Sequence, residues 1–320
     1  MEMRQLGRTG LRVAPLCLGG NVFGWTADEA ASFAVLDAYT EAGGNFVDTA
    51  DVYSRWIPGN KGGESETVLG RWMQQRNNRA EIVIATKVGH PMGDRPNRGG
   101  LARQWIVRAV EDSLRRLQTD YIDLYQAHID DQTTPLDETL RAFDDLVSAG
   151  KVRYIGCSNY SAWRLTRALW ESDKRGYARY DSVQPRYNMV ARDEYERELE
   201  GLCRDQQIGV ITYSSLASGF LSGKYRSGDD IGKSARGAGV QRNYMNERGF
   251  RVLDAVERAA AAHDATPAQI ALAWVLARPG VTAPIASATT VEQLGELLGA
   301  LSLRLSAETV EQLDQASAWK

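Results

Sequence analysis

The sequence predicts an α/β protein: a single (β/α)8 TIM barrel, with long loops at the C-terminal ends of its strands, that occupies residues 1–320 as one domain. Eight short apolar runs alternate with segments of helical periodicity, which is typical of strand–helix units. No repeat, Pro-rich linker or low-complexity run divides the chain. A doubly wound sheet, the alternative, usually opens with a G-x-G-x-x-G turn, and "LGGNVFG" after the first apolar run lacks that spacing.

The expected elements follow in a regular order. The strands are expected at residues 15–20, 45–50, 81–89, 121–128, 152–159, 181–188, 208–216 and 282–289. The helices are expected at residues 28–42, 64–76, 103–117, 137–149, 161–174 and 192–206, within a long stretch that contains 247–278, and in a tail from 290 onwards. Each helix follows a strand, as the crossovers of a parallel barrel require.

Several helix boundaries carry local signals. Helix starts are indicated by "TADEA" from residue 26, "SAWRL" from 161 and "TPAQI" from 266, which offer capping residues. Gly43, Gly44 and Gly150 are expected to end helices in the left-handed conformation. The polar, Gly-rich stretch 222–246 is expected to be a mobile loop.

Composition and charge limit the function classes. The 320 residues are 43% hydrophobic and 25% charged, which is typical of a soluble globular protein with a sizeable core. A formal net charge of −3 gives no attraction for nucleic acid or an anionic membrane surface. No run approaches the roughly 20 apolar residues of a spanning helix, and the beginning of the chain has no apolar signal core. We therefore expect a cytoplasmic protein whose partner is a small molecule.

The cysteines do not suggest redox or metal chemistry. Cys17, Cys157 and Cys203 are an odd number at long spacings, without a C-x-x-C pair or neighbouring histidines. We expect three reduced thiols in the core and no metal site.

Polar residues stand where the expected strands end, which is where barrels of this kind carry their active sites. The second strand ends in Asp48 and leads to Tyr53, the third ends in Lys87, and the fourth ends in His128. The later strands end in Ser158 and Asn159, in Gln184, and in Tyr213 and Ser214. Each residue alone has an ordinary structural explanation, but together they are expected to face one mouth.

The residues at the ends of the second, third and fourth strands suit acid–base chemistry on a carbonyl. A phenol has an ordinary pKa of about 10, so we expect the Lys87 cation to lower the pKa of Tyr53. Asp48 is expected to keep Lys87 charged, and a neutral His128 to donate a hydrogen bond to a substrate oxygen. The set contains no evident nucleophile, and Asp48 beside Lys87 argues against a Schiff-base lysine, so a hydrolase or aldolase is disfavoured. None of these side chains supplies hydride, so a nicotinamide cofactor is expected.

The motifs resemble those of the aldo-keto reductase superfamily, including its bacterial members and the related channel β subunits. The segments are "VDTADVYS", "TKVG", "DLYQAHI", "VRYIGCSNY", "SVQPRYN" and "ITYSSLASGFLSGKY", in the expected order over essentially the whole chain. The resemblance implies a barrel that binds NADP(H) or NAD(H) without a dinucleotide-binding domain and reduces aldehydes or ketones. It makes Tyr53 the general acid, Lys87 and Asp48 its tuners, and His128 the group that orients the carbonyl.

The resemblance also implies a cofactor site. Ser158, Asn159 and Gln184 match the groups that bind the carboxamide, and Tyr213 the aromatic ring that stacks on the nicotinamide. The loop after the seventh strand offers Ser214, Leu216, Ser218 and Lys224 to the phosphates, with Arg236 as a further contact.

The adenosine end of that site follows the eighth strand. Ser287, Thr289, Gln293 and Glu296 match the superfamily's pattern there, whereas uncharged Thr290 and Leu297 replace an expected cation and asparagine. NADP(H) is favoured by the resemblance, and NAD(H) remains an alternative.

Substrate selection is expected to come from Phe23, Trp25, Trp56 and the "GHPMGDRPNRGG" segment, whose aromatic walls suit a small-molecule carbonyl or alcohol. Two alternatives stay open: a sugar or alcohol dehydrogenase that works in the oxidising direction, and a non-catalytic, cofactor-sensing subunit. The sequence identifies neither the substrate nor the oligomeric state.

Overall fold

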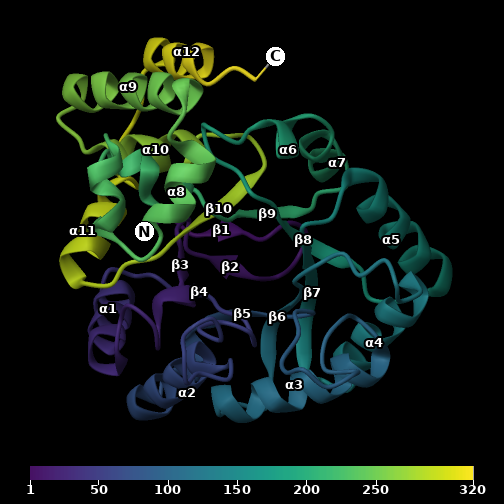
Figure 1. Ribbon diagram of the computed structural model, residues 1–320. Helices are drawn as coiled ribbons and strands as arrows, with labels where there is room; N and C mark the ends of the chain where they lie inside the picture. Colours follow the sequence, from purple (N-terminus) through teal and green to yellow (C-terminus); the bar gives the residue numbers. More distant parts are fainter. Residues whose placement is uncertain (320) are drawn as a thin grey trace.

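The computed structural model describes residues 1–319 and contains a closed barrel of eight parallel strands (Figure 1). The strands, in barrel order, are β3 (Cys17–Gly19), β4 (Phe46–Asp48), β5 (Val83–Val88), β6 (Ile122–Ala127), β7 (Val152–Ser158), β8 (Tyr180–Gln184), β9 (Gly209–Thr212) and β10 (Val281–Ala286), with β10 pairing back to β3. This confirms the predicted fold class and all eight strands. The observed strands are shorter because their polar C-terminal residues leave the sheet for the loops.

Helices surround the barrel. They are α1 (Glu29–Glu41), α2 (Glu64–Arg76), α3 (Arg103–Leu117), α4 (Leu136–Ser148), α5 (Ala162–Arg175), α6 (Asp193–Glu196), α7 (Leu199–Asp205), α9 (Glu247–Ala262), α10 (Pro267–Leu276), α11 (Val291–Gly299) and α12 (Ala307–Ala316). The stretch 247–278 holds two helices, because Thr266 caps a new helix and Pro267 occupies its first position. The segment 192–206 is likewise divided into two.

Most predicted boundaries are confirmed. Asp28 and Ser161 accept a hydrogen bond from the first turns of α1 and α5. Gly43 and Gly150 have φ of 85° and 74°, the left-handed conformation expected. The prediction for Gly44 is wrong, since its φ is not positive; it is instead a close-contact position, where a Cβ would lie 2.3 Å from the Tyr39 ring.

Helical structure occupies part of the stretch 222–246, for which the composition indicated a mobile loop. The stretch contains the 3₁₀ helix η4 (Gly228–Lys233) and the helix α8 (Gly237–Tyr244), and follows η3 (Ala217–Ser222). Ser227 and Asp230 form a capping box at the start of η4. The Tyr244 ring stacks on Phe220 with centroids 6.0 Å apart, so α8 has a core contact that a count of glycines does not reveal.

A short hairpin, which the sequence did not predict, covers one end of the barrel. Its strands β1 (Arg4–Gln5) and β2 (Arg12–Val13) pair antiparallel and are too short to show a pattern. Gly7 in its turn has φ of 55°, and a Cβ there would lie 2.6 Å from the amide of Gly209, where β9 begins. The hairpin therefore lies against the N-terminal ends of the strands, opposite the polar rim.

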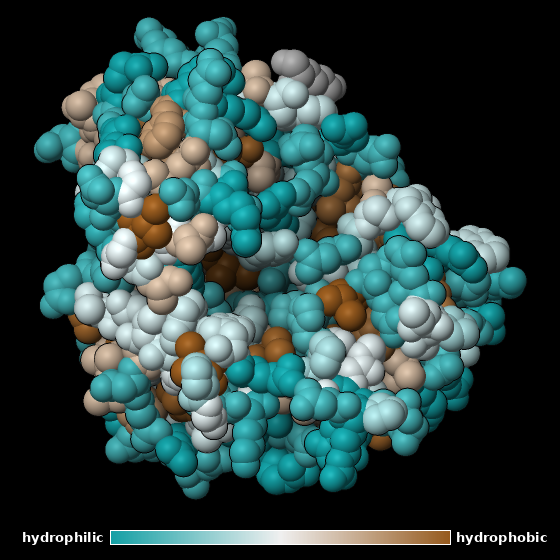
Figure 2. Space-filling model, viewed as in Figure 1, coloured by the Kyte–Doolittle hydropathy of each residue, from teal (hydrophilic) through white to brown (hydrophobic). Residues whose placement is uncertain are grey.

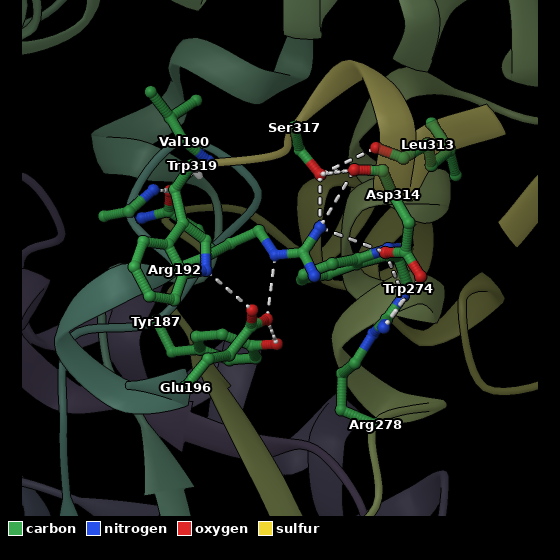
Figure 3. A network of polar contacts seen from close by, with 12 residues as sticks. Tyr187, Val190, Arg192, Glu196, Trp274, Arg278, Leu313, Asp314, Ser317 and Trp319 are labelled. Carbon is green, nitrogen blue, oxygen red and sulfur yellow. Dashed lines mark hydrogen bonds and ion pairs between the residues drawn. The ribbon is translucent and has the colours of Figure 1, made fainter. Parts of the chain in front are cut away.

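A polar network fastens the C-terminal helix to the barrel (Figure 3). Asp314 on α12 accepts hydrogen bonds from Trp274 at 2.9 Å and Arg278 at 2.6 Å, and pairs with Arg192 at 3.2 Å. Arg192 also pairs with Glu196 at 2.8 Å. These contacts join α12 to α10 and to the segment between β8 and α6, and we call them the C-terminal network.

The cysteine prediction is confirmed: Cys17, Cys157 and Cys203 are buried and free. Burial raises the pKa of each thiol, which disfavours the reactive thiolate. Across residues 1–319, no group of three or more His, Cys, Asp or Glu side chains is placed to hold a metal ion. No helix in the same range is long and apolar enough to cross a membrane.

Candidate active site

The structure brings Lys87, Asp48 and Tyr53 into direct contact at the C-terminal rim. Lys87 Nζ donates to Asp48 Oδ2 at 2.6 Å and to Tyr53 Oη at 2.9 Å. The backbone oxygen of Thr49 accepts from the same ammonium at 2.8 Å, so all three of its protons are engaged. The Lys87 side chain is fully buried and Asp48 is 2% exposed, which keeps water from screening the ion pair.

Strand register produces this contact. Asp48 is the last residue of β4 and pairs with Ala85 in β5, and Lys87 lies two positions further along. Side chains two positions apart point to the same side of a strand, so Ala85 and Lys87 share a face. The chain then turns after Asp48, and this turn brings Tyr53 back above the ammonium, where Lys87 Nζ lies 4.7 Å from the ring centroid.

The electrostatics of the pair differ in part from expectation. Burial alone lowers the pKa of Lys87, but Asp48 and Tyr53 together raise that pKa above its ordinary value, so the ammonium stays charged. Burial raises the pKa of Tyr53 to about 12, with Lys87 opposing and Asp48 adding to the rise. Lys87 therefore acts on Tyr53 in the expected direction, but desolvation is the larger effect. At neutral pH the phenol keeps its proton.

His128 stands beside Tyr53, with ring centroids 5.9 Å apart. Burial, followed by Lys87 and His90, lowers the pKa of His128 well below its ordinary value. The imidazole is thus neutral at pH 7, as the predicted role requires. Its Nδ1 is buried and has no hydrogen-bond partner within residues 1–319. The His90 ring packs edge-on against it at 4.4 Å.

The second oxygen of Asp48 is held from the opposite side of the barrel. Gln184 Nε2 donates to Asp48 Oδ1 at 2.8 Å, and Gln126 approaches the same oxygen at 3.4 Å. Ser158 Oγ donates to the backbone oxygen of Gln184 at 2.7 Å. The polar residues predicted separately from strands β4, β5, β7 and β8 therefore form one connected network.

Asn159 and Tyr213 form the next layer of that network. Tyr213 Oη donates to Asn159 Oδ1 at 2.9 Å, and Asn159 Nδ2 donates to the backbone oxygen of His128 at 2.9 Å. Asn159 adopts a left-handed φ of 61°, which a non-glycine residue rarely does and which is frequent at functional sites. Burial raises the pKa of Tyr213, so this phenol is also a neutral donor.

A cavity of about 920 Å³ opens over this rim. Figure 2 shows a hollow near the middle of the molecule, with hydrophilic side chains at its border. The cavity is lined by 17 of the 20 residues that the sequence nominated: Trp25, Asp48, Tyr53, His128, Ser158, Asn159, Gln184, Tyr213, Ser214, Leu216, Ser218, Lys224, Arg236, Ser287, Thr289, Gln293 and Glu296.

Three nominated residues do not line the cavity. Lys87 lies behind the surface, in contact with Asp48 and Tyr53. Phe23 is fully buried in the core, so the structure does not bring it to the site, contrary to its predicted place. Trp56 is 49% exposed and borders the site through its ring, which lies 6.1 Å from that of Tyr53 and 5.4 Å from that of Trp25.

The loop after β9 presents backbone to the cavity. Ser214 and Ser218 have left-handed φ of 56° and 58°, and Gly219 follows at 93°. These turns bring the backbone of Ser214, Ser218 and Gly219 to the cavity wall, where a ligand can approach it closely. Lys224 and Arg236 also line the cavity. The Nη2 of Arg236 is buried without a partner in the described chain, and the guanidinium lies 5.5 Å from the Trp25 ring centroid.

Near α11, uncharged Thr290 and Leu297 stand where the superfamily's pattern has a cation and an asparagine. Thr290 caps α11 and accepts a hydrogen bond from the Gln293 amide, while the side chain of Gln293 accepts from Thr289 at 3.0 Å. Ser287 donates to Asn21 Oδ1 at 2.6 Å. The start of α11 thus lies at the cavity, and its free amides favour a negative group.

Sequence reasoning missed several residues of the lining. Asn21 follows the first strand, so the rule of polar residues after strands would have found it, whereas His90 lies in the segment after the third strand that was expected to contact the substrate. Lys233 also lines the cavity and pairs with Asp230 at 2.6 Å. No sequence signal identified it, because it lies within the helices of 222–246 that the composition concealed.

Comparison with known proteins agrees with this fold and this rim. The chain belongs to the aldo/keto reductase family, whose model matches residues 15–318. It is 39% identical to the oxidoreductase YrpG of Bacillus subtilis, over 98% of this chain and 95% of that protein. It is 34% identical to the norsolorinic acid reductase of Aspergillus flavus, over 96% of this chain and 78% of that protein. The chain is 33% identical to a probable voltage-gated potassium channel β subunit of Oryza sativa, over 98% of this chain and 96% of that protein. The chain is an NAD(P)-dependent oxidoreductase.

Proposed function

We propose that this protein catalyses the reversible, NADP(H)-dependent reduction of aldehydes or ketones to alcohols, with Tyr53 as the general acid. The observation that carries the proposal is the hydrogen bond from buried Lys87 to the Tyr53 hydroxyl, with Asp48 on the same ammonium and the phenol at the cavity wall. Such a group delivers a proton to a carbonyl oxygen in the cavity.

The residues around the cavity fit a nicotinamide dinucleotide. Arg236 carries a buried, unpartnered Nη2 in a cavity that also has a helix start, and both favour phosphate. Ser158, Asn159 and Gln184 offer amide and hydroxyl groups to a carboxamide, and Tyr213 offers a ring to the nicotinamide. When bound, the cofactor supplies or accepts the hydride.

The chain's own groups account for the proton. Tyr53 holds its proton at neutral pH, and neutral His128 faces the same space and donates a hydrogen bond to the substrate oxygen. After the phenol gives up its proton, the Lys87 ammonium stabilises the phenolate that remains, because it already donates to Tyr53 Oη. In the oxidising direction the same pair accepts the proton from an alcohol.

NADP(H) is the proposed cofactor because two cations of the cavity are available to a third phosphate. Lys224 and Arg236 make no ion pair with any acidic side chain among residues 1–319, whereas Lys233 pairs with Asp230. A cation near the adenosine ribose favours the 2′-phosphate. Because Thr290 is uncharged, we assign the binding of the 2′-phosphate to the cations that follow β9.

The proposed substrate is a small carbonyl compound bound beside Trp25 and Trp56, whose edge-to-face rings continue to Tyr53. Two relatives are named as reductases of norsolorinic acid, an organic small molecule, which supports a small-molecule substrate. The relatives named as channel β subunits support the alternative of a non-catalytic, cofactor-sensing subunit. A measurement of turnover decides between a reductase and such a subunit.

The decisive experiment is a fluorescence titration of the purified protein with NADPH and NADH, followed by nicotinamide absorbance with a panel of aldehydes and ketones. We expect tighter binding of NADPH, and oxidation of NADPH that depends on the carbonyl. Binding without turnover of any carbonyl or alcohol favours the sensing role. Absence of binding overturns the cofactor assignment, and with it the proposal.

A further inference from the structure

Two of the eight tryptophans project outward from one helix. Trp163 and Trp170 on α5 expose 58% and 56% of their surface. Tryptophan side chains are usually largely buried, so a pair of this kind is unusual. The two are seven residues apart, about two helical turns, and therefore lie on the same face of α5. Figure 1 shows α5 at the outer edge of the molecule, with no element outside it.

Two cations alternate with these rings. Arg167 and Lys174 lie four and eleven residues after Trp163, which places all four side chains along one stripe at 3.6 residues per turn. We call Trp163, Arg167, Trp170 and Lys174 the α5 stripe. Its opposite face packs inward through Leu165 and Ala168, which are buried.

The cations of the stripe differ from the other cations of α5 in their ion pairs. Arg164 pairs with Asp130 at 2.7 Å and Arg175 pairs with Glu171 at 3.0 Å. No acidic side chain among residues 1–319 forms an ion pair with Arg167 or Lys174. Lys174 lies over the Trp170 ring of its own helix at 4.7 Å. The stripe therefore has two exposed rings and two cations that no carboxylate neutralises.

The order of the stripe is self-complementary. When two copies of α5 are antiparallel about a two-fold axis between residues 168 and 169, Trp163 lies opposite Lys174 of the second copy. In the same arrangement Arg167 lies opposite Trp170 of the second copy. Every ring thus faces a cation, and no ring or cation faces its own kind. A parallel arrangement in the same register places cation against cation.

We propose that the α5 stripe is the centre of a two-fold symmetric homodimer held by reciprocal cation–π contacts. Cation–π contacts strengthen when water is excluded from them, and Trp and Arg are typical of interface hot spots. Homodimers are commonly closed by a self-complementary patch of this kind. The neighbouring helices α4 and α7, which pack against α5, would supply the remainder of the buried area. No residue of α5 lines the catalytic cavity, so the inference does not depend on the proposed reaction.

Sedimentation velocity of the full chain over a range of concentrations tests the dimer. We expect a reversible dimer of the 35.4 kDa chain, with a Kd that rises at least tenfold in Trp170→Ser and in Arg167→Glu. Val107→Ser is the matched control, since Val107 is an exposed apolar residue on α3, at 37% exposure, outside the stripe. A wild-type chain that stays monomeric, or a dimer that these substitutions leave unchanged, overturns the proposal.

A swap of two residues tests the antiparallel register. Trp163→Lys alone places Lys opposite Lys and should weaken the dimer. The double variant Trp163→Lys with Lys174→Trp restores a ring opposite each cation, so its Kd should return toward the wild-type value. Additive weakening in the double variant contradicts the two-fold pairing. Adsorption of a monomeric wild type to anionic lipid vesicles would assign the stripe to a membrane surface and likewise overturn it.

Discussion

Two carboxylates join distant parts of this chain, and they do so in different surroundings. Asp48 at the barrel mouth is held by Lys87 and Gln184, and Asp314 in the C-terminal network is held by Arg278 and Trp274 (Figure 3). The Asp48 side chain is 2% exposed, whereas that of Asp314 is 32% exposed. Water therefore screens the second network and not the first.

The two networks also differ in where they end. At the mouth, the Lys87 ammonium that neutralises Asp48 also reaches Tyr53, which lines the cavity. In the C-terminal network, Asp314 and the donors around it lie outside the cavity lining. The same kind of ion pair thus contacts the proposed proton donor in one region and fastens a helix in the other. Substitutions in the first should change chemistry, and substitutions in the second should change stability alone.

Tyr53→Phe should have the largest effect. The substitution removes the phenolic proton and leaves the ring, so turnover should fall by about 10²–10⁴-fold, the usual contribution of a general acid. Cofactor affinity, measured by fluorescence titration, should stay within a factor of two or so because packing is preserved. Turnover close to that of the wild type would show that another group donates the proton.

Lys87→Met should damage both chemistry and stability. It leaves the Asp48 carboxylate buried without its cation, which typically costs about 3–5 kcal/mol. Urea denaturation measures this loss. Lys233→Met is the matched control, because the Lys233 side chain is 54% exposed and water screens its ion pair with Asp230, so the loss of stability should be much smaller. Equal losses of stability in the two variants would contradict the distinction between buried and screened pairs.

Asp314→Ala should separate stability from activity. Arg278, Trp274 and Arg192 all lose an acceptor, and we expect the free energy of unfolding to fall by about 1–3 kcal/mol. Turnover of the folded protein should not change, since Asp314 does not line the cavity. Glu311→Ala on the same helix is the control, because Glu311 is exposed and, within residues 1–319, accepts a side-chain hydrogen bond from Gln315 alone. A kinetic defect in Asp314→Ala with normal stability would join the network to the active site.

The strand-borne part of the site could be predicted, and the reason is geometric. Asp48, Lys87, His128 and Gln184 lie at or just after the ends of strands whose apolar runs are visible in the sequence, and a barrel brings such ends together. The sign of the net pKa shift of Tyr53 could not be predicted, because it depends on how closely the surrounding loops bury the ring. The hairpin at residues 4–13 escaped prediction because its two-residue strands show no periodicity.

In the segment 222–246, helical structure was missed because the composition suggested a loop. Its glycines and charges suggested a loop, yet α8 packs through tertiary contacts such as that between Tyr244 and Phe220. Gly237 is required there by close backbone approach, since a Cβ at this position would lie 1.8 Å from the carbonyl oxygen of Ile231. Glycine in this region therefore indicates tight packing, which composition alone cannot distinguish from flexibility.

The smallest expected effect is the dependence of stability on pH. It distinguishes the barrel mouth from the C-terminal network, because the mouth contains a histidine that burial and a neighbouring cation hold neutral and the C-terminal network contains no histidine. The folded-state pKa of His128 is well below its ordinary value of 6.5, so below pH 6.5 the unfolded chain binds a proton that the folded chain does not. Stability should therefore decrease as the pH falls below 6.5, by up to about 1.4 kcal/mol per pH unit for this one proton.

Urea denaturation at several pH values measures that slope. His128→Gln should make it shallower by about one proton, leaving the smaller part due to His90, whose pKa is lowered by burial and by Lys87. His263→Gln is the control, because His263 caps α9 away from the cavity. An unchanged slope in His128→Gln would mean that folding does not lower the pKa of His128. The imidazole would then gain its proton near pH 6.5 in the folded protein, and the neutral hydrogen-bond donor of the proposed mechanism would be lost below that pH.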